Sequence, residues 1–159
     1  MADLAPRIEA RRDSAGYADD YAAWVAHQVR LLRERRLDEL DFENLIDEVE
    51  SLSITVYREF VSVLRLIVMH MLKWDYQPTR RTRSWQSLIG VNQRNALDLL
   101  IENPSFKSRL DTALSKAYFA ARREASGETD LPFKTFPETC PYDWTAITTR
   151  EHLLPGDDA

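Results

Sequence analysis

The sequence is poor in the residues that interrupt helices, with only 4 glycines and 7 prolines among 159 residues. Long stretches contain neither residue, which favours helices over turn-rich β architectures. The single cysteine, Cys140, cannot form an internal disulfide, which excludes a disulfide scaffold. No apolar run approaches the roughly 20 residues of a membrane-spanning helix, and the first residues lack the apolar segment of a secretory signal. We therefore expect a helical protein of the cytoplasm.

The sequence also lacks a large excess of either charge, because its 21 basic and 26 acidic residues leave a formal net charge of only -5. This balance gives no overall attraction to nucleic acid, although it allows a local basic patch. A chain of this length can bury roughly two thirds of its unfolded surface in one domain. We predict a loose arm at 1–16, a single domain at 17–155 and a disordered tail at 156–159.

Apolar residues recur at steps of three and four, which is the period of an amphipathic helix. This period predicts one helix over 18–35 and a second over 42–74. Asp41 is the predicted N-cap of the second helix, since its carboxylate can accept from the free N–H groups of the first turn. Short hydroxyls and β-branched residues around Ser53 compete with helix formation. An unbroken helix and a pair of helices divided near Ser53 are both compatible with this pattern.

The same period predicts a third helix over 84–103 and a fourth that follows Pro104. Asn103 is expected to cap the fourth helix, and Gly127 is expected to end it. The residues that follow contain several prolines and predict an extended tail with a short helix at 143–149. The predicted fold is therefore all-α, a four- or five-helix antiparallel bundle with an extended, proline-containing C-terminal tail packed on it.

The segment at 70–85 combines basic and aromatic side chains and is the candidate binding site. Its candidate partner- or anion-binding residues are His70, Lys73, Trp74, Tyr76, Arg80, Arg81, Arg83 and Trp85. Cations can hold phosphates or carboxylates, and aromatic faces can stack on bases or pack on a protein partner. The alternative interpretation is structural: Trp74 and Trp85 continue the core faces of their helices, while the arginines pair with acidic residues of the same protein.

An acidic segment at 38–50 contains seven carboxylates and no lysine or arginine. Glu43 and Asp47 are four residues apart and share a helix face, which is compatible with half of a metal site. The Glu-x-x-His spacing of di-iron bundles is absent, so the favoured interpretation is a solvated helix start. Cys140 has no flanking signature of a nucleophile. We predict no metal ligand, no cofactor and no catalytic residue.

These observations favour a non-enzymatic module that binds a protein partner through 70–85. Binding of nucleic acid or an anion through the same segment is the alternative, followed by a metal-dependent enzyme that uses 38–50. The sequence does not predict the oligomeric state.

Several motifs also occur together in a known family. Residues 41–52 read DFENLIDEVESL, and residues 70–78 read HMLKWDYQP. Further matching motifs are Tyr17 to Trp24, Arg83-Ser84-Trp85, Leu131-Pro132, Phe136-Pro137 and Cys140-Pro141-Tyr142. Over 17–155 the chain resembles the bacterial family of uncharacterised proteins called domain of unknown function 29. It departs from the family pattern at Ser53-Ile54, where members often carry glycine, and at Asp20, where phenylalanine is usual.

The resemblance implies a small helical protein of the bacterial cytoplasm. It implies no activity, substrate or cofactor, so no catalytic residue can be transferred to this chain. It adds weight to 70–85 as the segment in which specific binding is expected.

Overall fold

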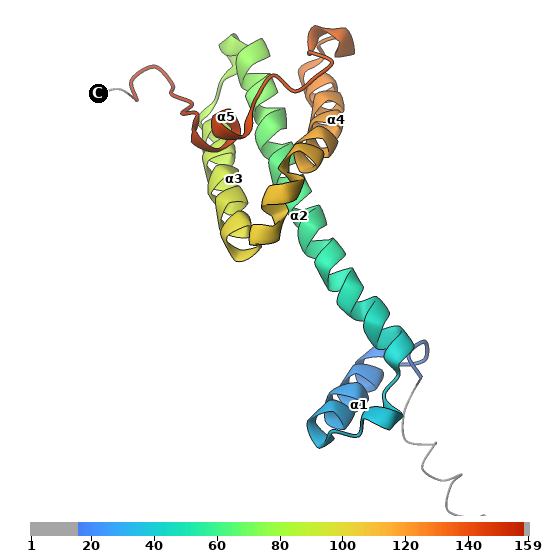
Figure 1. Ribbon diagram of the computed structural model, residues 1–159. Coiled ribbons are helices and arrows are strands. Elements are labelled where there is room, and N and C mark those ends of the chain that lie inside the picture. Colours follow the sequence, from blue (N-terminus) through green and yellow to red (C-terminus); the bar gives the residue numbers. More distant parts are fainter. Residues whose placement is uncertain (1–15, 158–159) are drawn as a thin grey trace, which may run out of the picture. The chain divides into compact units, whose positions relative to one another are not determined.

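The computed structural model describes residues 16–157, where all regular structure is helical (Figure 1). The predicted all-α fold is therefore confirmed. The predicted arm at 1–16 lies outside the described residues except for Gly16, as do the last two residues of the predicted tail. The chain divides into two compact units, one through Ser53 (unit 1) and one from Ile54 onward (unit 2). We describe each unit separately, and the single domain at 17–155 stays a prediction.

Unit 1 is a helical hairpin made of α1, Tyr21–Glu34, and the first turns of α2, Phe42–Tyr76. A short 3-10 turn, Leu37–Glu39, connects them. The Asp20 carboxylate accepts a hydrogen bond from the Ala23 N–H at 3.0 Å and caps α1. Arg35 adopts the left-handed conformation (φ 57°) and ends the helix.

Asp41 fixes the geometry of this hairpin. Its carboxylate accepts from the Asn44 N–H, which confirms the predicted N-cap of α2. It also accepts from the Trp24 indole N–H at 3.0 Å, while the Asp41 N–H donates to the Gln28 side chain at 2.9 Å. One residue thus starts α2 and ties that start to two buried side chains of α1. Beyond it, α2 continues through Ser53 without interruption, so the unbroken helix is the correct alternative.

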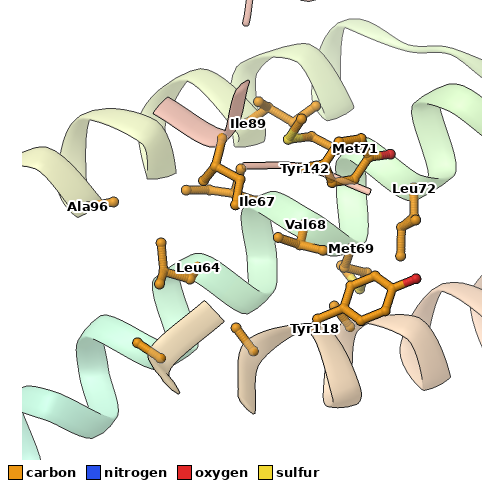
Figure 2. Close-up of a cluster of buried hydrophobic side chains, with 14 of the residues drawn as sticks. Leu64, Ile67, Val68, Met69, Met71, Leu72, Ile89, Ala96, Tyr118 and Tyr142 are labelled. Atoms are coloured by element: carbon orange, nitrogen blue, oxygen red, sulfur yellow. The ribbon is translucent and has the colours of Figure 1, made fainter. Parts of the chain in front are cut away.

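In unit 2 the second part of α2 lies between α3, Arg83–Glu102, and α4, Leu110–Thr129 (Figure 1). The short helix α5, Trp144–Thr149, packs on α3. The 3-10 turns Pro78–Arg80, Pro104–Arg109 and Phe133–Thr135 make the connections. Figure 2 shows α2 side chains at the centre of the core with Ile89 and Ala96 of α3, Tyr118 of α4 and Tyr142 of the tail around them. No helix in the described part of the chain is both long enough and apolar enough to cross a membrane.

One predicted helix boundary of unit 2 and one predicted side-chain cap are wrong. Gly127 does not end α4, which continues to Thr129 and stops where Asp130 adopts the left-handed conformation (φ 58°). The buried Thr129 hydroxyl donates to the Ala125 carbonyl at 2.6 Å and holds this last turn. Asn103 does not cap the next helix, because its side chain donates backwards to the Leu99 carbonyl at 3.0 Å. The predicted short helix at 143–149 is confirmed, with Asp143 as its cap.

Candidate functional site

The structure separates the eight candidate residues by exposure. His70, Lys73 and Trp74 are buried near the end of α2. Tyr76 and Trp85 are half-buried against the core of unit 2, and Arg80, Arg81 and Arg83 are exposed around the start of α3. All eight residues lie in unit 2, but only the three arginines are freely accessible. We call these three residues the arginine turn.

His70 is held inside the bundle. Its Nδ1 lies 2.8 Å from the Leu66 carbonyl and must donate to it, since a carbonyl only accepts. Burial lowers the pKa of His70, the hydrogen bond to Leu66 opposes this effect, and the Lys73 charge adds to it. The ring is therefore neutral near pH 7 and serves packing of α2.

Lys73 is a buried cation whose charge is satisfied within unit 2. Its Nζ lies 2.5 Å from the Glu128 carboxylate of α4 and 4.5 Å from the centre of the Trp85 ring. A buried charge is tolerated when it is paired and desolvated against an aromatic face. One face of the Trp85 ring is therefore covered by Lys73. Neither residue is free to bind a ligand through these groups.

Trp74 is the aromatic centre of the junction between α2 and the tail. The Arg81 guanidinium lies 5.1 Å from the Trp74 ring centre, and its Nε donates to the Trp74 carbonyl at 2.9 Å. The His152 ring meets Trp74 edge-on at 5.3 Å. Arg81 is thus oriented by Trp74 although its side chain reaches solvent.

Asp75 anchors the C-terminal tail to α2, a role that the sequence analysis missed. Its two carboxylate oxygens accept from the Arg150 guanidinium at 2.6 and 2.8 Å, and one also accepts from the buried Tyr142 hydroxyl at 2.8 Å. Burial alone would raise the pKa of Asp75, but these hydrogen bonds more than offset it and the pKa lies below its usual value. The only sequence signal was an acidic residue within an otherwise basic segment.

The arginine turn lies at the start of α3. The Thr82 hydroxyl accepts from the Trp85 N–H and caps the helix, whose first turn contains no acidic residue. A carboxylate from the tail, Asp157, lies 3.2 Å from the Arg83 guanidinium and accepts from Gln86 at 2.6 Å. Arg80 forms no ion pair with any residue in 16–157. The turn already holds one carboxylate and keeps a second cation available.

The acidic segment is used to build unit 1. Glu48 accepts from the Tyr17 hydroxyl at 2.6 Å and from the Tyr21 hydroxyl at 3.0 Å, while Asp41 caps α2. Over residues 16–157, no three side chains of the histidine, cysteine, aspartate or glutamate type converge in a way that could hold a metal ion. The geometry gives no support to a metal-dependent reaction at this segment.

Cys140 lines a pocket of about 370 Å³ between α4 and the tail. Its thiol donates to the Tyr142 carbonyl, and burial raises its pKa, so the sulfur stays protonated near neutral pH. Arg122 borders the same pocket but donates through Nε and Nη2 to the Phe136 carbonyl. A thiol that stays protonated is a poor nucleophile.

We expect unit 2 to lose stability as the pH falls from about 6.5 to 4, because of His152. The ring is buried, and neither nitrogen has a hydrogen-bond partner among the described residues. Burial and the nearby Arg150 charge lower its pKa to about 4. In this pH window His152 is protonated in the unfolded chain but stays neutral in the folded one. The free energy of unfolding therefore falls by up to about 3 kcal/mol.

Urea unfolding of wild type and His152→Leu at a series of pH values checks this expectation. The variant should retain or exceed wild-type stability at neutral pH, since leucine has no polar atom to satisfy. It should show a flatter pH dependence, with a residual slope because the pKa of His70 is also lowered. Equal slopes in the two proteins would contradict the assignment to His152.

Comparison with known proteins identifies a family for this chain but gives no activity. No curated protein and no solved structure matches the chain. One family model, described as a domain of unknown function, matches residues 17–153, which is most of the chain and confirms the resemblance seen in its motifs. The chain therefore belongs to the family Domain of unknown function DUF29.

Proposed function

We propose that this protein is a non-enzymatic interaction module of the cytoplasm that binds an acidic segment of a protein partner at the arginine turn. The observation that carries the proposal is the carboxylate of Asp157, which is held between Arg83 and Gln86 at the start of α3. A guanidinium beside a helix N-terminus favours carboxylates by charge and by hydrogen bonding. Arg80, exposed on the same turn, offers a second cation to a partner that carries several acidic side chains.

A protein partner fits this turn better than single-stranded nucleic acid does. Nucleic acid needs open aromatic faces on which bases can stack. Trp74 is buried, Trp85 lies under the Lys73 ammonium group, and the Tyr76 ring packs 5.1 Å from Phe136. The cations of the turn are accessible, but its aromatic rings are occupied within unit 2.

The double variant Arg80→Glu with Arg83→Glu tests the proposal. It should fold normally, because both side chains are exposed, and it should lose the bound partner, because the turn then repels acidic groups. The matched control is Arg58→Glu with Arg94→Glu, which makes the same charge change at exposed positions of α2 and α3. The measurement is quantitative affinity purification from the source organism with each protein as bait.

Proteins enriched on wild type and on the control, but absent from the Arg80/Arg83 variant, are the expected result. Equal recovery on all three baits would refute binding at the arginine turn. Nuclease treatment separates the alternative: partners that disappear with nuclease indicate nucleic-acid binding through the same cations.

A further inference from the structure

We propose that unit 1 pairs with unit 1 of a second copy of this chain, through the apolar face of its hairpin, to form an intermolecular four-helix bundle. This surface is independent of the arginine turn, which lies in unit 2. We define the hairpin face by its exposed apolar residues, which are Tyr21, Val29, Leu32, Phe42, Ile46, Val49 and Leu52.

The apolar side chains of the hairpin face are more exposed than expected for a pair of helices that buries its apolar residues without a partner. Val49 and Leu52 are 64% and 66% exposed, and Phe42 and Ile46 are each 55% exposed. They nevertheless keep the three- and four-residue spacing of a buried stripe. Farther along the same helix, Phe60 and Leu64 continue this spacing and are fully buried. The apolar spacing at 42–52 is therefore typical of a helix face that packs in a core, but no second layer of helices covers it in the described part of unit 1.

A groove between the two helices shapes this face. It has a volume of about 180 Å³ and is lined by Tyr21, Trp24, Val25, Gln28, Val29, Leu32, Leu45, Glu48 and Leu52. In a four-helix bundle the apolar side chains of both helix pairs fill the central space onto which such a groove opens. Two hairpins that face each other would form this arrangement.

The exposed area agrees with one side of a stable dimer. Aromatic side chains present roughly 150–250 Å² each and aliphatic ones less, so seven residues that are about half exposed, two of them aromatic, amount to an area of roughly 600 Å². The largest apolar patch of a typical monomer covers about 300–600 Å². One partner in a standard interface contributes about 800 Å².

Charges on the two edges of the hairpin select a second copy as the occupant. Glu43, Asp47 and Glu50 follow Phe42, Ile46 and Val49 by one residue each, so an acidic edge borders the α2 side of the face. Arg33 is four residues beyond Val29 and borders the α1 side. A twofold axis parallel to the helices places α1 of each copy against α2 of the other, so that unlike edges meet. The other twofold arrangement would place the two acidic edges together.

The paired arrangement also predicts a specific contact. Arg33 lies near the end of α1 and Glu43 near the start of α2, so both residues are at the end of the hairpin that carries the connecting turn. With the twofold axis parallel to the helices, these ends coincide in the two copies. Arg33 of one copy then faces Glu43 of the partner subunit.

The first test measures the mass of the full-length chain in solution by sedimentation equilibrium at micromolar concentrations. Wild type should have twice the chain mass of 18.5 kDa. Val49→Glu should raise the dissociation constant by at least about 100-fold, because it buries an unpaired charge in the interface. The matched control is Val91→Glu, at an exposed valine of α3 outside the hairpin face, which should remain dimeric. Circular dichroism verifies that both variants are folded.

The second test measures the contact between Arg33 and Glu43 of the partner subunit by charge reversal. Arg33→Glu and Glu43→Arg should each weaken the dimer when alone, since each places like charges opposite one another. An equimolar mixture of these two variants should form heterodimers with close to wild-type affinity. A monomeric wild type, a dimeric Val49→Glu, loss of the dimer in Val91→Glu or failure of the mixture to associate would each overturn the proposal. None of these outcomes bears on the Arg80/Arg83 experiment.

Discussion

Replacement of Phe60 by alanine is expected to destabilise unit 2 by about 3–5 kcal/mol. Phe60 is fully buried in α2, and its ring centre lies 5.3 Å from that of Phe106 and 6.2 Å from that of Trp144. One side chain thus joins α2 to the turn before α4 and to α5. Removal of the ring loses buried apolar contacts. It also leaves a cavity that the three surrounding elements cannot fill by moving together. A loss of this size is a large part of the total stability of a small domain.

Urea unfolding followed by circular dichroism measures this effect. The control is Phe119→Ala, because Phe119 of α4 belongs to the same unit and is 63% exposed. This substitution should change the free energy of unfolding by less than about 1 kcal/mol. A Phe60 variant as stable as the Phe119 variant would contradict the assigned core.

The helices could be predicted because their signals are local. The period from Phe42 to Trp74 and the carboxylate of Asp41 are both visible within a few turns of sequence, and both correspond to what the structure contains. The end of α4 is different, because the hydrogen bond of Thr129 and the left-handed Asp130 outweigh the weak helix propensity of Gly127. Propensity alone does not show where tertiary contacts hold a last turn.

Exposure could not be predicted from the same period. Val49 and Ile67 are 18 residues apart, which is five whole turns of α2, yet Val49 is 64% exposed and Ile67 is fully buried. Periodicity identifies a face and does not identify what covers it. The candidate site shows the same limit, because Lys73 has its acceptor on Glu128, 55 residues away. The residue types at 70–85 could be selected from the sequence, but their division into buried and accessible groups required the fold.

Asp75→Ala is expected to destabilise unit 2 by about 3 kcal/mol. The substitution leaves the Arg150 guanidinium and the buried Tyr142 hydroxyl without their shared acceptor. The tail from Tyr142 to Arg150 would lose its polar attachment to α2 while keeping its apolar contacts. We expect Asp98→Ala, at an exposed position of α3, to cost less than about 0.5 kcal/mol.

A double-mutant cycle distinguishes this attachment from a general packing defect. Tyr142→Phe should cost about 1 kcal/mol in the wild-type background and close to nothing when Asp75 is already alanine, because the hydroxyl then has no acceptor to lose. Since the folded state holds the pKa of Asp75 below its usual value, the stability that this carboxylate contributes is present above about pH 4 and is lost as the pH falls further. The Asp75→Ala protein should therefore lack this acid-sensitive component. Equal costs of Tyr142→Phe in both backgrounds would mean that the tail is held by apolar packing alone.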